Sequence, residues 1–132
     1  MNPIKNIALF AHDSRKQDLL SWLREHKNRL TNYPFFTSDT TGDLIEQNTA
    51  LTVNRVTGGP EKEGQKITTL MSEGKVDLLI FFWDPLEPVS LDPNMKTLLH
   101  SATRSNIPTA SNKSTVDFIM NSILINDCQL TG

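Results

Sequence analysis

The sequence predicts one α/β domain over residues 1–132, a three-layer α/β/α sandwich with a mainly parallel sheet of about five strands. Two observations support this prediction. Short apolar runs alternate with segments whose apolar residues recur every three or four positions, which is typical of buried strands alternating with helices. The length of 132 residues matches one domain, and no linker, internal repeat or low-complexity segment divides it.

The N-terminal part of the chain contains the first two predicted strands. Residues 7–11 form the continuous apolar run of a buried strand, and residues 34–37 form a second, shorter one. A single amphipathic helix is expected between them, with Asp13 or Ser14 as its cap. Its apolar stripe recurs at helical spacing and comprises Leu19, Leu23, His26 and Leu30, with Trp22 beside them.

The middle of the chain continues the alternation. Residues 38–42 predict a polar loop before a short helix at 43–48, and the alternating residues 52–56 predict a strand near the sheet edge. Glycine and proline predict a second loop at 57–64. The helix after this loop is expected to end near Gly74. Its apolar positions are Ile67, Leu70 and Met71.

The C-terminal part contains the most hydrophobic segment, residues 76–82, which is typical of a central parallel strand covered on both faces. Asp92 and Pro93 predict the start of the next helix, because they suit the N-cap and the first helical position. A last short strand is expected at 107–110, before a helix that Ser114 caps.

Composition and charge narrow the partners that the chain can have. Fifteen acidic and thirteen basic residues give a net charge of -2, whereas a duplex-binding domain usually has a basic excess. One cysteine excludes an intramolecular disulfide and a CxxC metal knuckle, and no apolar run approaches the ~20 residues of a bilayer span. The N-terminal residues lack the features of a signal peptide. We therefore expect a cytoplasmic protein with no nucleic-acid or membrane partner, no metal and no cofactor.

Ligands of such folds bind beyond the carboxyl ends of the strands, so a site is expected in the loops there. The Thr40-Thr41-Gly42 turn opens a helix, and its backbone N–H groups and two hydroxyls can hold a phosphate. Lys16 follows His12 closely and can reach the same anion, while Gly58-Gly59 lets a backbone approach a ligand. Each feature also has a common structural explanation, as a cap, a tight loop or a hydrogen-bonded histidine. Together they favour a small phosphorylated ligand.

Several sequence stretches give the chain a family resemblance. In chain order they are Ile7-Ala8-Leu9-x-Ala11-His12-Asp13-x-x-Lys16, Thr40-Thr41-Gly42-x-Leu44-Ile45, Gly59-Pro60, Ser72-Glu73-Gly74-Lys75-x-Asp77-x-Leu79-Ile80-Phe81-Phe82-Trp83-Asp84-Pro85-Leu86, Asn106-Ile107-Pro108 and Asp117-Phe118-Ile119. The stretch from 72 to 86 is long and specific. Through these residues the chain resembles the methylglyoxal synthase family along almost its whole length.

The resemblance implies a flavodoxin-like sandwich, usually assembled as a homohexamer, that eliminates phosphate from dihydroxyacetone phosphate to give methylglyoxal. In that reaction a carboxylate removes a carbon-bound proton, histidines and nearby donors stabilise the developing oxyanion, and a pocket holds the phosphate. Inorganic phosphate typically inhibits such enzymes. We therefore expect a small phosphorylated metabolite or inorganic phosphate as the ligand, and a homo-oligomer as the assembly.

The resemblance also implies roles for individual residues. The substrate- and phosphate-binding residues that it implies are Lys16, Ser38, Thr40, Thr41, Gly58, Gly59 and Asp13. The catalytic residues that it implies are His12 and Asp84. Ser38 stands where the family has a threonine, which preserves the hydroxyl.

The sequence departs from the family at the position of the catalytic base. The family's catalytic aspartate aligns with Gly64, counting back without a gap from Gln65 and Ser72-Glu73-Gly74-Lys75. Losing a general base costs on the order of 10²–10⁴ in rate. Glu63 is adjacent and becomes a displaced base if the loop shifts by one residue, whereas loop solvation is the ordinary role for Glu61 and Glu63.

Three further positions also differ. Asn94 and Leu91 stand where a second pocket acid and a downstream histidine are expected, and Asp39 replaces a glycine inside the phosphate turn. The Asp39 charge should repel an anion unless Lys16 or Arg15 compensates, or unless its side chain points to water.

The departures leave more than one function open. The first hypothesis is a methylglyoxal synthase-type phosphate lyase with impaired catalysis. The second is a non-catalytic sensor of a phosphorylated ligand on the same fold, similar to the regulatory methylglyoxal-synthase-like domain of carbamoyl phosphate synthetase. A structural protein whose partner is another chain is a third.

Overall fold

The computed structural model describes residues 5–30, 33–49, 51–57, 60–82 and 95–120. Strands and helices alternate along the chain, as expected. In chain order the elements are β1 (Ile7–Ala11), the 3-10 turn η1 (Asp13–Arg15), α1 (Lys16–Glu25), α2 (Lys27–Leu30), β2 (Phe35–Ser38), α3 (Asp39–Asn48), β3 (Asn54–Val56), α4 (Pro60–Ser72), β4 (Leu78–Phe82), α5 (Met95–Arg104), β5 (Thr109–Ala110) and α6 (Lys113–Met120). None of the helices among these described residues is long and apolar enough to cross a membrane.

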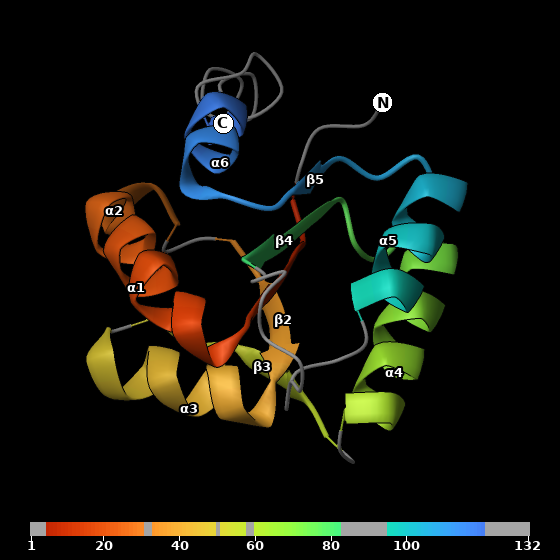
Figure 1. The fold of residues 1–132 in the computed structure, drawn as a ribbon, viewed down its shortest axis with the longest axis horizontal. Helices are drawn as coiled ribbons and strands as arrows, with labels where there is room; N and C mark the ends of the chain where they lie inside the picture. Colours follow the sequence, from red (N-terminus) through yellow and green to blue (C-terminus); the bar gives the residue numbers. More distant parts are fainter. Residues whose placement is uncertain (1–4, 31–32, 50, 58–59, 83–94, 121–132) are drawn as a thin grey trace.

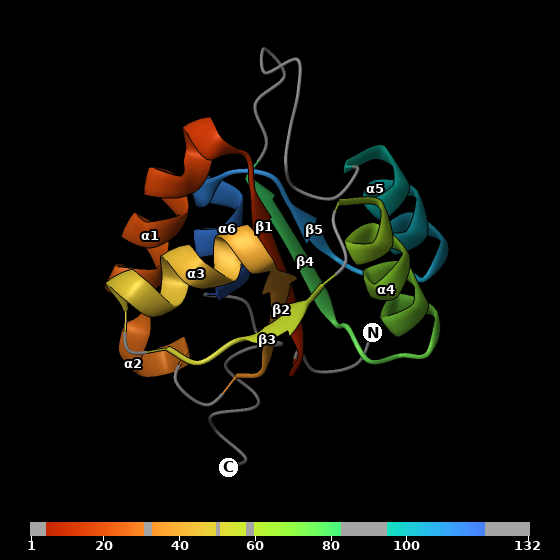
Figure 2. The same cartoon turned by 90° about the horizontal axis from the view of Figure 1, so that it is seen from below.

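The five strands of the described chain form one sheet in the order β3-β2-β1-β4-β5, and every pair is parallel. The expected five-stranded parallel sheet is therefore confirmed. The hydrophobic segment predicted at 76–82 forms β4, an inner strand between β1 and β5, while β1 occupies the middle (Figure 2). Both strands are buried at every residue, which explains why their sequences are continuously apolar.

Helices cover both faces of the sheet. Helices α1, α3 and α6 lie on one face, and α4 and α5 lie on the other (Figure 1). Alternate residues of β1 enter separate apolar clusters: Ile7, Leu9 and Ala11 pack with α1 and α6, and Ala8 and Phe10 pack with α4 and α5. Each large side chain buried in these clusters stabilises the fold by about 1.5–3 kcal/mol.

The apolar stripe predicted as one helix belongs to two. Helix α1 ends at Glu25 and α2 begins at Lys27, with His26 between them at φ −112° and ψ 17°. Leu23 and Leu30 are nevertheless fully buried, so the stripe itself was predicted correctly. The break places the His26 ring 3.0 Å from an Asp117 carboxylate oxygen of α6, a contact that spacing along the chain does not reveal.

Two predicted loops are partly helical instead. Helix α3 begins at Asp39, inside the loop expected at 38–42, and α4 begins at Pro60, inside the loop expected at 57–64. Proline suits the first helical position because its fixed φ matches a helix and its missing N–H would have no intrahelical partner there. The polar residues that follow these two helix starts are therefore first-turn residues.

Helix ends differ in how well the sequence predicted them. Gly74 ends α4 as expected, with φ +75°, and the Gly74 and Lys75 N–H groups donate to the carbonyl oxygens of Met71 (3.1 Å) and Leu70 (2.8 Å). The cap expected at Ser114 is wrong. Asn112 caps α6, because its Oδ1 accepts a 2.8 Å hydrogen bond from the Thr115 N–H. The helix start predicted at Asp92 and Pro93 lies outside the described residues.

Candidate functional site

The carboxyl ends of β1 and β2 lie side by side, since these strands are parallel neighbours. Strand β1 leads into His12 and then into α1, and β2 ends at Ser38, from which α3 begins. Lys16 is the first residue of α1 and is half-buried. The structure thus brings the described N-terminal candidate residues to one end of the sheet; whether they share a ligand stays a prediction.

His12 is held at the junction of β1 and β4. Its backbone N–H donates to the Phe82 carbonyl oxygen at 2.9 Å, and its ring meets Phe81 edge-on, with 5.4 Å between ring centroids and an interplanar angle of 88°. Only 7% of the residue is exposed. Backbone and ring contacts to β4 therefore fix the imidazole position.

Ser38, Thr40 and Thr41 form a cluster of hydroxyl groups that we call the hydroxyl turn, residues 38–41. Ser38 is the N-cap of α3: its Oγ accepts a hydrogen bond from the Thr41 N–H at 3.3 Å and donates one to Thr41 Oγ1 at 3.0 Å. Thr40 Oγ1 lies 3.4 Å from the same Ser38 oxygen. Ser38 and Thr41 are fully buried, while Thr40 is exposed. The turn is therefore a helix cap and, by its partial positive charge, a place where an anion can bind.

Glu63 lies in the first turn of α4 and is only 4% exposed. It occupies the same helix stripe as Ile67 and Met71, which pack in the cluster with Phe10 and Phe81. Since α4 runs antiparallel to the strands, Glu63 lies one turn nearer to their carboxyl ends than Ile67. Loop solvation is therefore wrong for Glu63, because the residue is helical and buried.

Asp39 is the first residue of α3, where the helix dipole stabilises a negative charge. Arg15, one of the two residues expected to compensate its charge, instead pairs with Asp18 at 3.3 Å. In the described part of the chain, no basic side chain lies within ion-pair distance of the Asp39 carboxylate. Any repulsion that this carboxylate exerts on an anion is therefore not cancelled by a direct ion pair there.

Arg55 is a residue of this region that sequence reasoning missed. It lies on the edge strand β3, and its guanidinium donates to the carboxylates of Asp43 and Glu46 on α3 and, at 3.5 Å, to the Asp39 carbonyl oxygen. We call Arg55, Asp43 and Glu46 the Arg55 network. The hydrogen bond from Arg55 is the main cause that lowers the pKa of Glu46, and the two carboxylates raise the pKa of Arg55. The one sequence signal for this network was the spacing of Asp43 and Glu46, which lie three residues apart and so share one face of the helix.

Several predicted residues are not described by the structure. They are Gly58, Gly59, Asp84, Leu91, Asn94 and the side chain of Asp13. The contribution of the segment after β4 to the site therefore stays a prediction.

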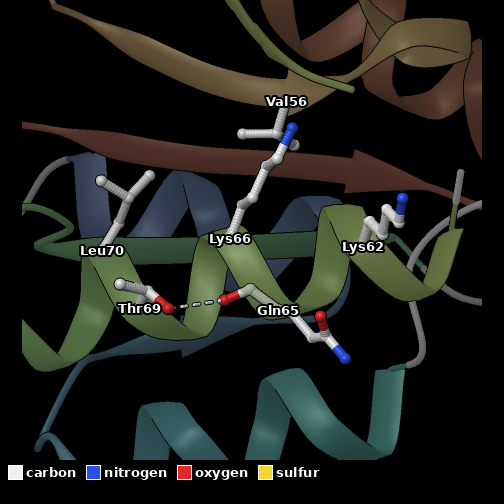
Figure 3. Close-up of a pocket in the computed structure, with 6 residues that line it drawn as sticks. All are labelled: Val56, Lys62, Gln65, Lys66, Thr69 and Leu70. Atoms are coloured by element: carbon white, nitrogen blue, oxygen red, sulfur yellow. Dashed lines mark hydrogen bonds between the residues drawn. The ribbon is translucent and has the colours of Figure 1, made fainter. Parts of the chain in front are cut away.

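A pocket of about 590 Å³ lies on the flank of α4 that faces the edge strand (Figure 3). Lys66 lies beside it, and its Nζ donates to the Thr57 carbonyl oxygen at 2.7 Å. The lining residues are Val56, Lys62, Gln65, Lys66, Thr69 and Leu70. None of the predicted site residues that the structure describes lines this pocket, although Val56 is the last residue of β3.

Comparisons with known proteins identify the class of the domain. A family model described as the MGS-like domain matches residues 18–111. The methylglyoxal synthase of Pectobacterium atrosepticum is 49% identical over 123 residues, which cover 93% of this chain and 81% of the relative. That of Photorhabdus laumondii is 47% identical over 127 residues, covering 96% and 84%.

A solved structure agrees with the sequence relatives. The crystal structure of the methylglyoxal synthase from Elizabethkingia anophelis NUHP1 matches with a TM-score of 0.87 at 35% identity, covering 95% of this chain and 82% of that one. The chain belongs to the methylglyoxal synthase family, and its fold is the flavodoxin-like α/β sandwich that the resemblance implied.

Proposed function

We propose that the chain binds a small phosphorylated metabolite, dihydroxyacetone phosphate, at the carboxyl ends of its strands and converts it slowly to methylglyoxal and phosphate. One observation carries the proposal: the hydroxyl turn opens α3 at the strand end next to the one that leads into buried His12. Membership of the family supports the reaction.

The phosphate is proposed to bind at the start of α3. The backbone N–H groups there point along the helix dipole, and Thr40 brings an exposed hydroxyl-bearing side chain to the same turn. Lys16, at the start of the neighbouring α1, supplies a positive charge from the adjacent strand end. The Asp39 carboxylate opposes the phosphate and lowers its affinity.

The proposed reaction begins when a base takes a proton from the hydroxymethyl carbon of the substrate. The electron pair moves onto the carbonyl oxygen, which gives an enediolate. The enediolate then expels phosphate from the carbon on the opposite side of the carbonyl. The remaining enol tautomerises to methylglyoxal. His12 is proposed to donate a hydrogen bond to the oxyanion, and its packing against Phe81 supports this role, since a fixed donor needs little reorganisation.

Glu63 is the proposed base. Gly64 has no side chain, whereas Glu63 is a carboxylate on the buried stripe of α4 at the strand ends. Because it stands one residue from the position of the family's aspartate, its approach to the reacting carbon is less direct. We therefore expect proton removal to be slower by about 10²-fold or more than with a well-placed carboxylate.

An assay of methylglyoxal and phosphate release from dihydroxyacetone phosphate by the purified protein tests the proposal, with a protein-free reaction as background. We expect slow release of both products in equal amounts. Glu63→Gln should abolish release and leave phosphate binding intact, and Glu73→Gln, at an exposed position just after α4, is the matched control. The proposal would be contradicted if the unmodified chain showed no turnover and bound no phosphate.

A non-catalytic sensor of a phosphorylated ligand is the second candidate, and the glycine at position 64 favours it. The same assay separates the two functions. Phosphate binding by calorimetry without any release of methylglyoxal supports the sensor, whereas release that depends on Glu63 excludes it.

We also propose that the chain assembles as a homohexamer, as the family resemblance implies. Light scattering at micromolar concentration measures the mass of the particle. A particle of one chain, with a mass near 14.8 kDa, would contradict this proposal.

A further inference from the structure

Arg55 contacts α3 through the stem of its side chain as well as through its charged end. Gly42, in the first turn of α3, is buried, and a Cβ added there would lie 3.1 Å from Arg55 Nε and 3.2 Å from Arg55 Cγ. The arginine stem therefore lies closely against the helix backbone where the hydroxyl turn ends. A larger residue at position 42 would have to push this stem away.

The Arg55 network extends this contact over two turns of the helix. Asp43 and Glu46 take separate nitrogens of the guanidinium, and the Asp39 carbonyl oxygen lies 3.5 Å from Nη1. Arg55 itself is fixed by strand pairing, since it lies opposite Thr37 of β2. Thr37 is fully buried and donates a 2.5 Å hydrogen bond to the Leu9 carbonyl oxygen of β1. The Arg55 side chain thus joins the start of α3 to β3. Through the pairing of β3 with β2, and through the hydrogen bond from Thr37 of β2 to β1, this contact is linked to all three strands.

We propose that Arg55 is a positioning residue, which holds the first two turns of α3 against β3 so that the N-terminus of this helix and the exposed Thr40 side chain face a phosphate. This inference rests on the phosphate site proposed above. Arg55 does not touch the ligand; it acts through the position of Ser38, Thr40 and Thr41.

A charge effect must be separated from this positioning effect. Asp39, Asp43 and Glu46 place three carboxylates on the first two turns of α3, and Arg55 pairs with two of them. Removing Arg55 would weaken anion binding by repulsion alone, by a few-fold over ~10 Å and less at high salt. Removing the two carboxylates instead breaks the same network but lowers the negative charge, so the two effects then have opposite signs.

Calorimetric titration with inorganic phosphate tests the proposal on the full chain. Arg55→Ala should raise the Kd about tenfold, as expected when a hydrogen bond to a charged group is weakened. The double variant Asp43→Asn with Glu46→Gln should raise the Kd several-fold as well, despite its lower negative charge. Arg104→Ala, which removes an exposed arginine at the last turn of α5, is the charge-matched control and should leave the Kd unchanged.

A second readout follows the helix start directly. The Thr41 N–H is capped by Ser38 Oγ, so its hydrogen exchange should accelerate in Arg55→Ala and in the double variant but not in Arg104→Ala. In turnover, KM should rise while kcat stays nearly constant. Should Arg55→Ala fail to fold, the double variant and Arg55→Lys, which keeps the charge but not the two-pronged contact, decide the matter.

The outcomes separate the two proposals. If the unmodified chain binds phosphate and the double variant binds it equally or more tightly, Arg55 acts by charge alone and the positioning role is overturned. If the unmodified chain binds no phosphate, the phosphate site itself is wrong, and the positioning role falls with it.

Discussion

Two charged networks join helices to their neighbours in the described part of the chain, and they differ in what lies beside them. The Arg55 network joins β3 to the start of α3, where the hydroxyl turn lies. The second, which we call the Lys113 network, joins the end of α1 to α6. Its contacts are Lys113–Glu25 (2.9 Å), Lys113–Asp117 (3.8 Å) and His26–Asp117 (3.0 Å).

The two networks contain similar ion pairs but differ in their expected roles. Glu25 is the last residue of α1, about 13.5 Å along the helix from Lys16, so the Lys113 network lies away from the strand-end site. Ligand atoms of Glu25, His26 and Asp117 lie within 4.8 Å of one another, as in a cation site. The Lys113 ammonium already contacts both carboxylates, however, and supplies the positive charge. We expect this network to contribute to stability alone.

The largest expected effect lies at the strand ends. Gly64→Asp puts a carboxylate where the family resemblance implies a catalytic aspartate, and we expect turnover of dihydroxyacetone phosphate to rise by about 10²-fold. The same change made together with Glu63→Gln should retain this gain, since the introduced carboxylate would then be the base. Equal turnover before and after the Gly64 change would show that Glu63 is already a fully effective base.

The second effect concerns the charge inside the hydroxyl turn. Asp39→Asn removes a negative charge close to the proposed phosphate, and the Kd for inorganic phosphate should fall by about three- to tenfold at low salt. Asp39→Gly should also lower this Kd, but by less, because glycine has a low helix propensity and weakens the start of α3. Titration at two salt concentrations checks this prediction, because the gain should shrink as salt rises. An unchanged affinity of Asp39→Asn would mean that this carboxylate faces water.

The third effect concerns the Lys113 network, whose loss should lower stability without changing ligand binding or turnover. Asp117→Ala removes its contacts to both His26 and Lys113, and we expect Tm to fall by about 2–5 °C. Phosphate affinity and kcat should not change. A loss of affinity in this variant comparable to that of Arg55→Ala would remove the distinction between the two networks.

The smallest effect is a pH dependence in the Arg55 network. The pKa of Glu46 is lowered from its ordinary value of 4.5, mainly by Arg55. Its contribution to stability is therefore fully present above pH 4.5 and is lost as the pH falls through the lowered pKa. Melting curves of the unmodified chain and of Glu46→Gln should differ at pH 7 and converge in acid. A difference that persists in acid would indicate packing in place of charge.

The sequence predicted the sheet well because burial on both faces leaves a direct trace. Residues 7–11 and 78–82 are continuously apolar for that reason alone. The starts of α3 and α4 were mistaken for loops because caps, prolines and acids of a first turn have the composition of a loop. The burial of Glu63 was missed for the same reason, since a helix start at Pro60 is needed to align it with Ile67.

The candidate site was only partly accessible from sequence. His12 and the Thr40-Thr41-Gly42 turn follow predicted strands, so their position at the strand ends could be inferred. The significance of Gly64 came only from the family resemblance, because a glycine carries no chemical signal. Arg55 could not be found from the sequence. It is an exposed residue of an edge strand, and its contact with α3 depends on how that helix packs against β3.

The middle position of β1 has a consequence for how the chain is made. Strand β1 leaves the ribosome first, yet it pairs with β4 along its whole length, from Ile7 opposite Leu78 to Ala11 opposite Phe82. At ~5–20 residues per second, synthesis of the intervening chain takes about 4–14 s. During that time an apolar strand exists without one of its two neighbours. Slowed or interrupted translation before β4 would therefore expose an aggregation-prone nascent chain, and holding chaperones should engage it in this interval.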